Sequence, residues 1–318
     1  MGLLDKLRRA KKPATETGHP GKEENLIQVF DKSGKPLYLT KEAWRTKVLP
    51  GMLSARWNNP DQLYQVIVGT LRDGLPADVA DAAEHLYKID SNHSRAVCAW
   101  ANVLTGMKQI DKAEEVLNSY IEQYGEEGYV VTNLAKVHAA RYDNDRAETI
   151  LWHALELDPN QKMAVGWFAA LANERGGKSA MVEAWERVAA LPGSWHAQLW
   201  LARAALESHN APGALAYYRE SLARVGETVP SDFLQQMRGD LGIHGRFTEL
   251  LELTEPYFVP EVHGLQVGNN LIKANIELGQ LQRARQILNQ LGTQSRPDWR
   301  AHLEYLDTEI ERKGTARY

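Results

Sequence analysis

The sequence predicts an all-α solenoid of about seven helical hairpins, with a small β-hairpin cap at its N-terminal end and a capping helix at its C-terminal end. Apolar residues recur at helical spacing from about residue 60 to residue 313, and polar or glycine-containing turns separate the runs. The pattern also repeats at an interval of about 34 residues, as between Ala113 and Ala147. Because one helical hairpin cannot bury its own apolar face, several must stack to be stable.

The segment from Gly128 to Gln161 shows the repeat most clearly. Two amphipathic patterns flank a polar turn at residues 143–145, and the unit closes at Asp158-Pro159-Asn160, where one helix ends and the next begins. The pattern residues are Val131, Leu134, Ala135, His138, Ala147, Leu151, Ala154 and Pro159. At these positions a tetratricopeptide repeat (TPR) carries Trp, Leu, Gly or Ala, Tyr, Ala, Phe, Ala and Pro. The segment therefore resembles a TPR, and the resemblance implies a right-handed superhelix.

Six further copies extend the resemblance over roughly residues 60–313. They span residues 60–93, 94–127, 162–194, 195–228, 229–264 and 265–298. The register slips by about one position at Arg175-Gly176-Gly177-Lys178, and in the copy at 229–264 two prolines, Pro256 and Pro260, delimit the second helix. Residues 299–313 are expected to form the terminal helix, whose charged face suits a C-terminal cap.

Residues 26–58 are expected to form the N-terminal cap. From Leu26 to Thr40 the period changes to alternation around a turn at residues 31–34, which predicts a β-hairpin. A helix at residues 41–48 should pack on the hairpin through Trp44 and end at Pro50-Gly51. The alternative role for the hairpin is strand addition to the sheet edge of a partner.

Residues 1–25 are interpreted as a basic amphipathic tail followed by a flexible linker. Leu3, Leu4 and Leu7 share one side of a short helical segment whose basic residues lie mostly elsewhere, a pattern that suits weak contact with a membrane surface. The alternative is a solvated tail that becomes ordered only on contact. The domain prediction is completed by the solenoid at residues 59–313 and a short C-terminal tail at residues 314–318.

Charge and cysteine content restrict the function classes. A formal net charge of −4 and a pI of about 6.2 give no general attraction to nucleic acid. One cysteine, Cys98, allows no disulfide framework and suits a reducing compartment. The sequence has neither an apolar run of membrane-spanning length nor a signal-peptide pattern at its start, so we expect a cytoplasmic protein.

No enzymatic motif survives inspection. Residues 172–179 differ from a phosphate-binding P-loop only by Ala172 in place of the first glycine. A helical pattern precedes this loop where a P-loop needs a strand, so a turn between helices is expected instead. The ten histidines show no metal-ligand spacing, and Cys98 has no activating neighbour on its helix. We therefore expect no enzymatic activity, no metal and no cofactor.

The resemblance to TPRs implies a binding surface, because in these arrays the first helix of each hairpin lines the concave groove. Aromatic and arginine side chains can anchor a peptide there, and asparagine amides can pair with its backbone. The candidate residues for binding a peptide or protein are Asn102, Tyr129, Asn133, Lys136, Trp167, His196, Trp200, Arg203, Asn269, Asn270 and Lys273, with Arg95 and Cys98 at equivalent positions. For Trp167 and Trp200 the alternative is packing between repeats.

Two details concern the charge of the ligand. The pair Asn133 and Lys136 recurs as Asn270 and Lys273, which predicts contact with an acidic or carboxylate-bearing ligand, against the alternative of ordinary surface charge. The carboxylate clamp of TPRs that bind heat-shock chaperones is not expected. Asn102 and Asn133 match that clamp, but its basic positions are occupied by Cys98, Met163 and Trp167.

The predicted function is a non-catalytic scaffold or adaptor that binds a protein segment in its groove, similar to bacterial-type TPR proteins that act as chaperone partners or assembly factors. This last step is by analogy, because one repeat fold supports many roles. Two alternatives remain open. The first is a membrane-peripheral assembly factor anchored by the basic N-terminal segment, and the second is a regulator whose repeats tighten around a small ligand.

Overall fold

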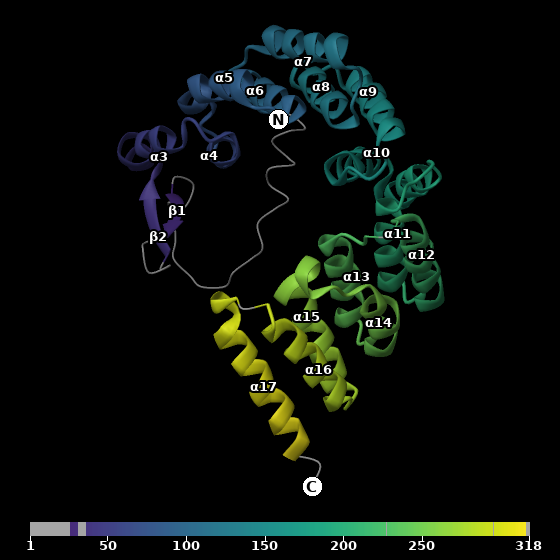
Figure 1. Ribbon diagram of the computed structural model, residues 1–318. Coiled ribbons are helices and arrows are strands. Elements are labelled where there is room, and N and C mark those ends of the chain that lie inside the picture. The colour runs from purple at the N-terminus through teal and green to yellow at the C-terminus, as the bar shows by residue number, and fades with distance from the viewer. Residues whose placement is uncertain (1–25, 31–35, 227, 295, 316–318) are drawn as a thin grey trace, which may run out of the picture. The chain divides into compact units, whose positions relative to one another are not determined.

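The computed structural model describes residues 26–30, 36–226, 228–294 and 296–315. The chain forms two compact units, Met1–Asp158 (unit 1) and Pro159–Tyr318 (unit 2), and the division falls inside the predicted solenoid segment. In each unit, helices lie side by side in pairs, which confirms the all-α prediction (Figure 1). The predicted tail with Leu3, Leu4 and Leu7 lies outside the described residues, as does the turn at residues 31–34.

Unit 1 begins with the predicted β-hairpin. Strand β1 (Leu26–Phe30) pairs antiparallel with strand β2 (Pro36–Thr40), and Ile27 stands opposite Leu39. Ile27 is buried in the same apolar cluster as Trp44. The hairpin therefore packs on the helices that follow it through this tryptophan, as predicted, because two strands alone cannot bury an apolar face.

The helical segment after the hairpin is longer than predicted. It consists of α2 (Lys41–Ala43), a π-helical turn (Trp44–Val48) and α3 (Leu49–Arg56), which follow one another directly. The expectation that Pro50-Gly51 ends the helix is wrong. Pro50 lies in the first turn of α3, where its missing N–H and fixed φ are tolerated, and the widened π-helical turn directly precedes it.

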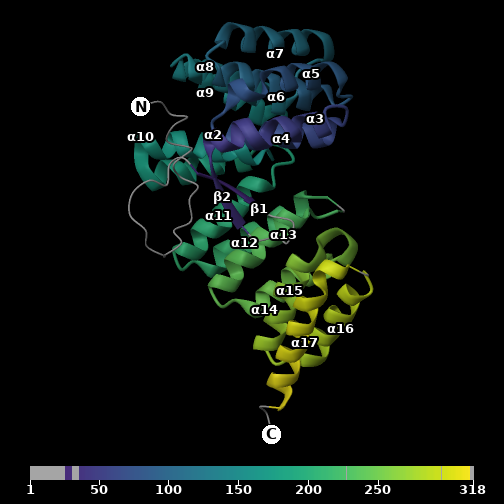
Figure 2. The ribbon, with the colours of Figure 1, turned by 90° about the vertical axis from the view of Figure 1, so that its left-hand side faces the viewer.

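Three helical hairpins complete unit 1. They are α4 (Pro60–Arg72) with α5 (Ala80–Ile89), α6 (His93–Gly106) with α7 (Ile110–Tyr124), and α8 (Gly128–Ala140) with α9 (Asn144–Leu157), and a 3₁₀ turn (Pro76–Val79) leads into α5. The first helices α4, α6 and α8 pack on one another in order (Figures 1 and 2). We call the side of these first helices that carries Asn102, Tyr129 and Lys136 the inner-helix face.

Small residues hold the two helices of each hairpin close together. Ala113, Ala147 and Ala154 are each at most 2% exposed, and Leu117 and Leu151 beside them are fully buried. Close packing of this kind leaves no room for a larger side chain at the alanine positions. The predicted pattern residues of these repeats are therefore core residues.

Most of the turns inside the hairpins share one geometry. In five of these turns, the second residue before the second helix has a positive φ, whereas in the turn between α4 and α5 the positive φ lies at Gly74, two residues before the 3₁₀ turn. The five residues are Lys108 (66°), Tyr142 (66°), His209 (57°), Gly245 (67°) and Gly279 (72°). Only glycine adopts this conformation without steric cost, yet three of the five positions carry other residues.

Unit 2 continues with further helices, two of which contain a glycine of non-helical conformation, Gly177 or Gly264. They are α10 (Lys162–Ala189), α11 (His196–Glu207), α12 (Ala211–Arg224), α13 (Ser231–Ile243), α14 (Phe247–Thr254), α15 (Pro260–Glu277), α16 (Leu281–Gly292) and α17 (Arg300–Thr315). Two 3₁₀ turns, Glu255–Tyr257 and Pro297–Trp299, follow α14 and precede α17. The first helices α11, α13 and α15 pack in order, and the terminal helix α17 packs on α15 and α16, as a cap should.

Glycine divides α10 into two helices. Gly177 has φ 70° and ψ −160°, a conformation that glycine alone tolerates, and helix flanks it on both sides. The P-loop-like segment at residues 172–179 is therefore an inter-helix turn, as its helical context predicts. Within the described residues, no helix is both long and apolar enough to cross a membrane, and no three His, Cys, Asp or Glu side chains cluster as metal ligands.

Candidate functional site

The inner-helix face of unit 1 carries a hydrogen-bonded group centred on one amide. Asn102 Nδ2 on α6 donates to Asn133 Oδ1 on α8 at 2.9 Å, and Lys136 Nζ donates to the same oxygen at 3.0 Å. Asn133 Nδ2 donates in turn to the carbonyl oxygen of Tyr129 at 2.8 Å. The repeat packs α6 on α8, so Asn102 lies beside the turn of α8 that carries Lys136, which is 34 residues further along the chain, and Asn133, which is 31 residues further.

Asn133 is a positioning residue in this group. Its side chain is 2% exposed, and its oxygen already accepts two hydrogen bonds. The expectation that its amide pairs with a peptide backbone therefore does not hold in this structure. Asn102 keeps a free acceptor, because its Nδ2 makes both of its hydrogen bonds, the second to the carbonyl oxygen of Cys98 at 2.7 Å.

The amine of Lys136 lacks a counter-ion. Among the described residues no carboxylate lies within ion-pair distance, and its one hydrogen bond goes to a neutral amide. Burial lowers the pKa of Lys136 to about 8, against a smaller opposing effect of Cys98. Cys98 is fully buried, and burial raises the pKa of its thiol to about 12. At pH 7 the group therefore holds one ammonium and a neutral thiol.

Aromatic and charged residues border the amine. Tyr129 is 39% exposed, and burial of its hydroxyl, with Cys98 nearby, raises the pKa of the phenol. Arg95 lies over the ring of Tyr64 at 5.0 Å and binds the buried Asp90 and the exposed Asp61. The charge of Arg95 is thus compensated within unit 1, which leaves Lys136 as the uncompensated cation of this group.

In unit 2, three predicted residues lie together on α11. His196 is 3% exposed, and its Nε2 accepts a hydrogen bond from Trp200 Nε1 at 3.3 Å. Burial, with Lys162 adding to it, lowers the pKa of His196 to about 4, so the ring is neutral at pH 7. His196 is therefore a buried support for Trp200, and the expectation that it contacts a ligand does not hold in this structure.

Trp200 and Arg203 are held by further contacts. The ring of Trp200 stacks on Trp185 at 5.5 Å, and the guanidinium of Arg203 lies over it at 4.7 Å. Arg203 Nε also donates to Asp240 Oδ1 at 2.8 Å. Trp200 keeps a half-buried edge, whereas Trp167 is only 3% exposed. Trp167 is therefore packed inside the protein, which corresponds to the alternative of packing between repeats.

The Asn and Lys pattern of α8 is not reproduced on α15. Asn270 Oδ1 accepts a hydrogen bond from Asn269 Nδ2 at 2.8 Å, and Lys273 is exposed with no described partner for its amine. Asn270 precedes Lys273 by the same three residues as Asn133 precedes Lys136, but only Asn133 meets its lysine. A shared sequence pattern thus gives two different local structures.

Sequence reasoning missed one buried cation, Arg238 on α13. It is 2% exposed and lines a pocket of about 320 Å³ with Gln235, Gln266, Asn269 and Asn270. A signal for it was present, because Arg203, Arg238 and Lys273 follow one another at equal intervals of 35 residues (238 − 203 and 273 − 238). They occupy the same position on three successive first helices.

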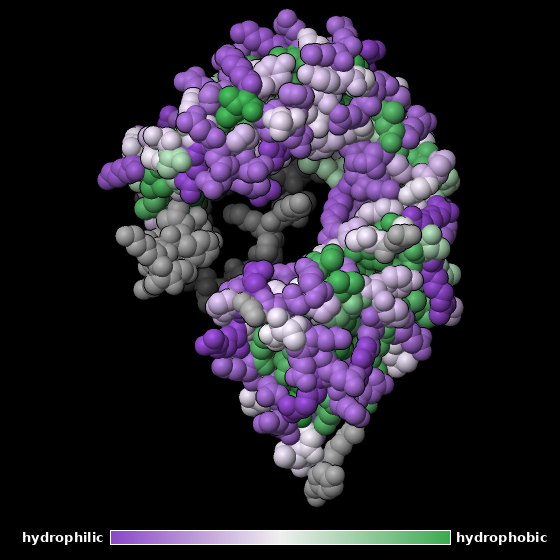
Figure 3. Space-filling view, in the orientation of Figure 1, coloured by the Kyte–Doolittle hydropathy of each residue, from purple (hydrophilic) through white to green (hydrophobic). Residues whose placement is uncertain are grey.

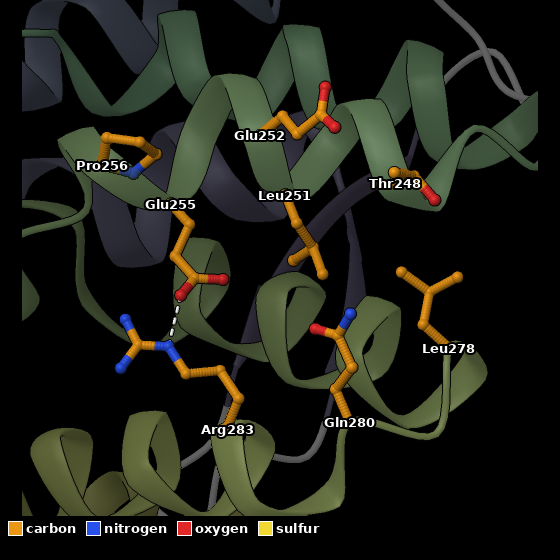
Figure 4. A pocket seen from close by; sticks show the side chains of 8 residues that line it. All are labelled: Thr248, Leu251, Glu252, Glu255, Pro256, Leu278, Gln280 and Arg283. Atoms are coloured by element: carbon orange, nitrogen blue, oxygen red, sulfur yellow. Dashed lines mark hydrogen bonds and ion pairs between the residues drawn. The ribbon is translucent and has the colours of Figure 1, made fainter.

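A second, larger pocket of about 460 Å³ lies between α14 and the turn that joins α15 to α16 (Figure 4). Arg283 is the cation of its lining, and it already pairs with Glu255. With Glu252 also in the wall, this pocket presents no uncompensated positive charge.

In the space-filling view, hydrophilic residues cover most of the visible surface of α5, α7 and α9 (Figure 3).

The arrangement of the hairpins decides their type. Five of them share a left-handed residue two positions before the second helix, and buried alanines lie between the paired helices. The helical hairpins resemble TPR-type repeats. The contacts between successive first helices in each unit follow from stacking such repeats.

Comparison with known proteins gives similarity of structure only. No protein-family model and no curated protein sequence matches this chain. Among solved structures, a tetratricopeptide repeat protein from Parabacteroides merdae is 9% identical (TM-score 0.32), with 79% of this chain and 98% of that chain covered. Yeast Tom70 is 11% identical (TM-score 0.43; 85% and 58% covered), so the match spans 58% of the Tom70 chain. PilF of Pseudomonas aeruginosa is 18% identical (TM-score 0.28; 81% and 99% covered).

Proposed function

We propose that this chain is a protein-interaction scaffold whose unit 1 binds an extended acidic segment of a partner protein on its inner-helix face. The observation that carries the proposal is the amine of Lys136, which is held in place by Asn133 and has no counter-ion among the described residues. A partly buried ammonium without a counter-ion has lost much of its hydration. A carboxylate that pairs with it supplies the missing charge.

The groups around the amine suit a peptide. Asn102 Oδ1 is free to accept a backbone N–H, and the Tyr129 ring offers an exposed aromatic surface. Tyrosine contributes a large contact area at low conformational cost, which makes it a frequent anchor of interfaces. A carboxylate on Lys136, a backbone N–H on Asn102 and an apolar contact on Tyr129 together describe an acidic residue in an extended segment.

The net charge of the chain sets a condition on this recognition. At a formal charge of −4 the protein does not attract acidic segments over long distances. Affinity must then come from the short-range contact with Lys136, and salt should weaken that contact less than it weakens an exposed ion pair.

Peptide selection tests the proposal. The full chain is used to select phage-displayed random dodecapeptides, and binding of the enriched peptides is measured by fluorescence anisotropy. We expect enrichment of Asp and Glu in the selected peptides. In Lys136→Gln we expect the affinity to fall by about tenfold or more, which corresponds to about 1.4 kcal/mol of binding free energy. Lys112→Gln is the matched control, because Lys112 is exposed on α7, the second helix of its hairpin.

Two results would contradict the proposal. One is enrichment of peptides without acidic residues, and the other is equal affinity of the wild type and Lys136→Gln. The two alternative functions remain predictions. The membrane-anchored alternative depends on Leu3, Leu4 and Leu7, which lie outside the described residues. Flotation with anionic vesicles, comparing the full chain with a chain that starts at Glu24, tests it. Thermal shift against peptide and nucleotide panels tests the regulatory alternative.

A further inference from the structure

Unit 2 contains a buried guanidinium whose charge is not compensated. Arg238 Nε donates to the carbonyl oxygen of Leu234 at 3.2 Å, and Nη1 donates to the carbonyl oxygens of Gln266, at 3.0 Å, and Val267. These acceptors are neutral. Burial lowers the pKa of Arg238 to about 10, which still leaves it charged at pH 7.

The nearest acidic residue along the helix does not serve as its counter-ion. Asp240, 5% exposed, accepts a hydrogen bond from Arg203 at 2.8 Å and another from the hydroxyl of Tyr218 at 3.2 Å. Among the described residues no carboxylate lies within ion-pair distance of Arg238. A buried cation in this state is costly, because its desolvation is not offset by an opposite charge.

One nitrogen of this guanidinium remains available. Nη2 donates to none of the described residues, and it is not among the fully enclosed polar atoms that lack a partner. Because Arg238 lines the pocket of about 320 Å³, we place the free N–H groups of Nη2 at this pocket. The three bonds to backbone carbonyls fix the guanidinium plane and so hold these donors in position.

The rest of the pocket wall consists of amides. His302 Nε2 lies 2.9 Å from Asn269 Oδ1, and the ring nitrogen must be the donor because an amide oxygen can only accept. Asn269 Nδ2 then donates to Asn270 Oδ1 at 2.8 Å, which leaves Asn270 Nδ2 as a free donor. The chain of bonds from His302 to Asn270 therefore leaves the N–H groups of a pocket-lining amide without a described acceptor. None of its lining residues is acidic.

We propose that this pocket, formed by Arg238, Gln235, Gln266, Asn269 and Asn270, binds the oxyanion group of a ligand, a carboxylate or a phosphoryl group. Guanidinium and amide donors are the groups that recognise such oxygens, and a bound anion would supply the counter-charge that Arg238 lacks. The inference concerns unit 2 and does not depend on peptide binding by unit 1. Its success or failure leaves the proposed function of unit 1 untouched.

The test titrates two simple anions into the full chain at constant ionic strength with chloride as the balancing ion. The probes are acetate and inorganic phosphate. Binding is followed by the Tm and by the NMR signal of the Nε–Hε group of Arg238, which is assigned by its absence in Arg238→Met. We expect a saturable shift of that signal and a rise in Tm of about 2–4 °C at tens of millimolar anion.

Two variants of equal charge make the test decisive. Asn270→Asp keeps the acceptor for Asn269 and places a carboxylate in the pocket. We expect it to raise the Tm without added anion and to abolish the response. Asn289→Asp makes the same change at an exposed position on α16 and should leave the response intact. Asn270→Asp also keeps the test valid if Arg238→Met fails to fold.

The outcomes separate the two ligand sources. A response to acetate alone assigns a carboxylate, and a stronger response to phosphate assigns a phosphoryl group. The proposal is overturned if neither anion moves the Arg238 signal, or if Asn270→Asp responds like the wild type.

Discussion

The side-chain amide of Asn102 and the amine of Lys136 donate to the same oxygen, Asn133 Oδ1, at 2.9 and 3.0 Å. One neutral acceptor thus joins two successive repeats and holds a lysine whose amine has no carboxylate within ion-pair distance among the described residues. If the acceptor carried a charge, the lysine would be neutralised without a ligand.

Replacing the shared amide by a carboxylate should neutralise the amine. In Asn133→Asp the new carboxylate accepts from Asn102 and Lys136 as the amide does now. We expect the pKa of Lys136 to rise from about 8 toward or above its ordinary value, because an opposite charge at hydrogen-bond distance favours the ammonium. NMR titration of the lysine side chain measures this pKa. An unchanged pKa would show that Asn133 does not control the amine.

Removing the amine should stabilise unit 1 at neutral pH. The pKa of Lys136 lies near 8 in the folded protein, below its ordinary value of 10.5, so its cost to folding is fully present below pH 8. That cost disappears as the pH rises from 8 to 10.5. Lys136→Met should therefore raise the free energy of unfolding by roughly 1–3 kcal/mol at pH 7, and the gain should be lost near pH 10.5.

Urea unfolding of unit 1 at the two pH values, followed by the NMR signals of its residues, measures this difference. Lys112→Met on α7 is the control, because that lysine is exposed and should change stability little at either pH. A loss of stability at pH 7 in Lys136→Met would mean that the hydrogen bond to Asn133 outweighs the burial of the charge. A binding residue that lowers stability is the usual sign of a functional site.

The turn between the two helices of α10 should tolerate only glycine. Gly177 has φ 70° and ψ −160°, and a Cβ added there would meet no atom within 4 Å. Any loss in Gly177→Ala therefore comes from backbone strain, and we expect about 1–3 kcal/mol. Gly166 in the same helix also has open space, but its conformation is helical, so Gly166→Ala should gain about 0.5–1 kcal/mol. Thermal unfolding compares them, and equal effects would contradict the assigned kink.

At the shared left-handed position in the hairpin turns, replacing a larger residue by glycine should stabilise the protein. Tyr142 has φ 66° and is 76% exposed, so its side chain contributes little packing to set against the strain. We expect Tyr142→Gly to stabilise the protein by roughly 0.5–1 kcal/mol. Glycine removes the left-handed cost of about 1–2 kcal/mol, and the extra entropy that it gives the unfolded chain offsets part of this gain. Tyr142→Ala, which keeps the strain, is the control in a thermal melt and should not gain.

Much of the fold could be predicted from the sequence because the same spacing of small and apolar residues recurs in several repeats. The alanines at 113, 147 and 154 and the leucines between them mark the contact between helices, and each copy confirms the register of the next. The predicted β-hairpin likewise followed from alternation and Trp44. The division at Asp158 was not predicted, because the periodic pattern runs through it unchanged.

The candidate site was less accessible to sequence reasoning. Periodicity assigns a side chain to the inner-helix face, but its exposure depends on which neighbours cover it. Trp167 and His196 occupy predicted groove positions and are each 3% exposed. Arg238 was missed for the opposite reason: an arginine in the weakest repeat is expected to be solvated, and only the structure shows that backbone carbonyls hold it inside.

The measurement that tests the central claim most directly is the pH dependence of the affinity for an acidic peptide selected on the full chain. The ammonium of Lys136 must be present for binding, and its pKa lies near 8, so the affinity should be nearly constant below about pH 7, begin to fall above it, and drop by about tenfold between pH 8 and 9.5. Lys136→Gln should bind weakly with no change over this range. A wild-type affinity that stays constant from pH 7 to 9.5 and equals that of Lys136→Gln would show that the acidic segment binds elsewhere.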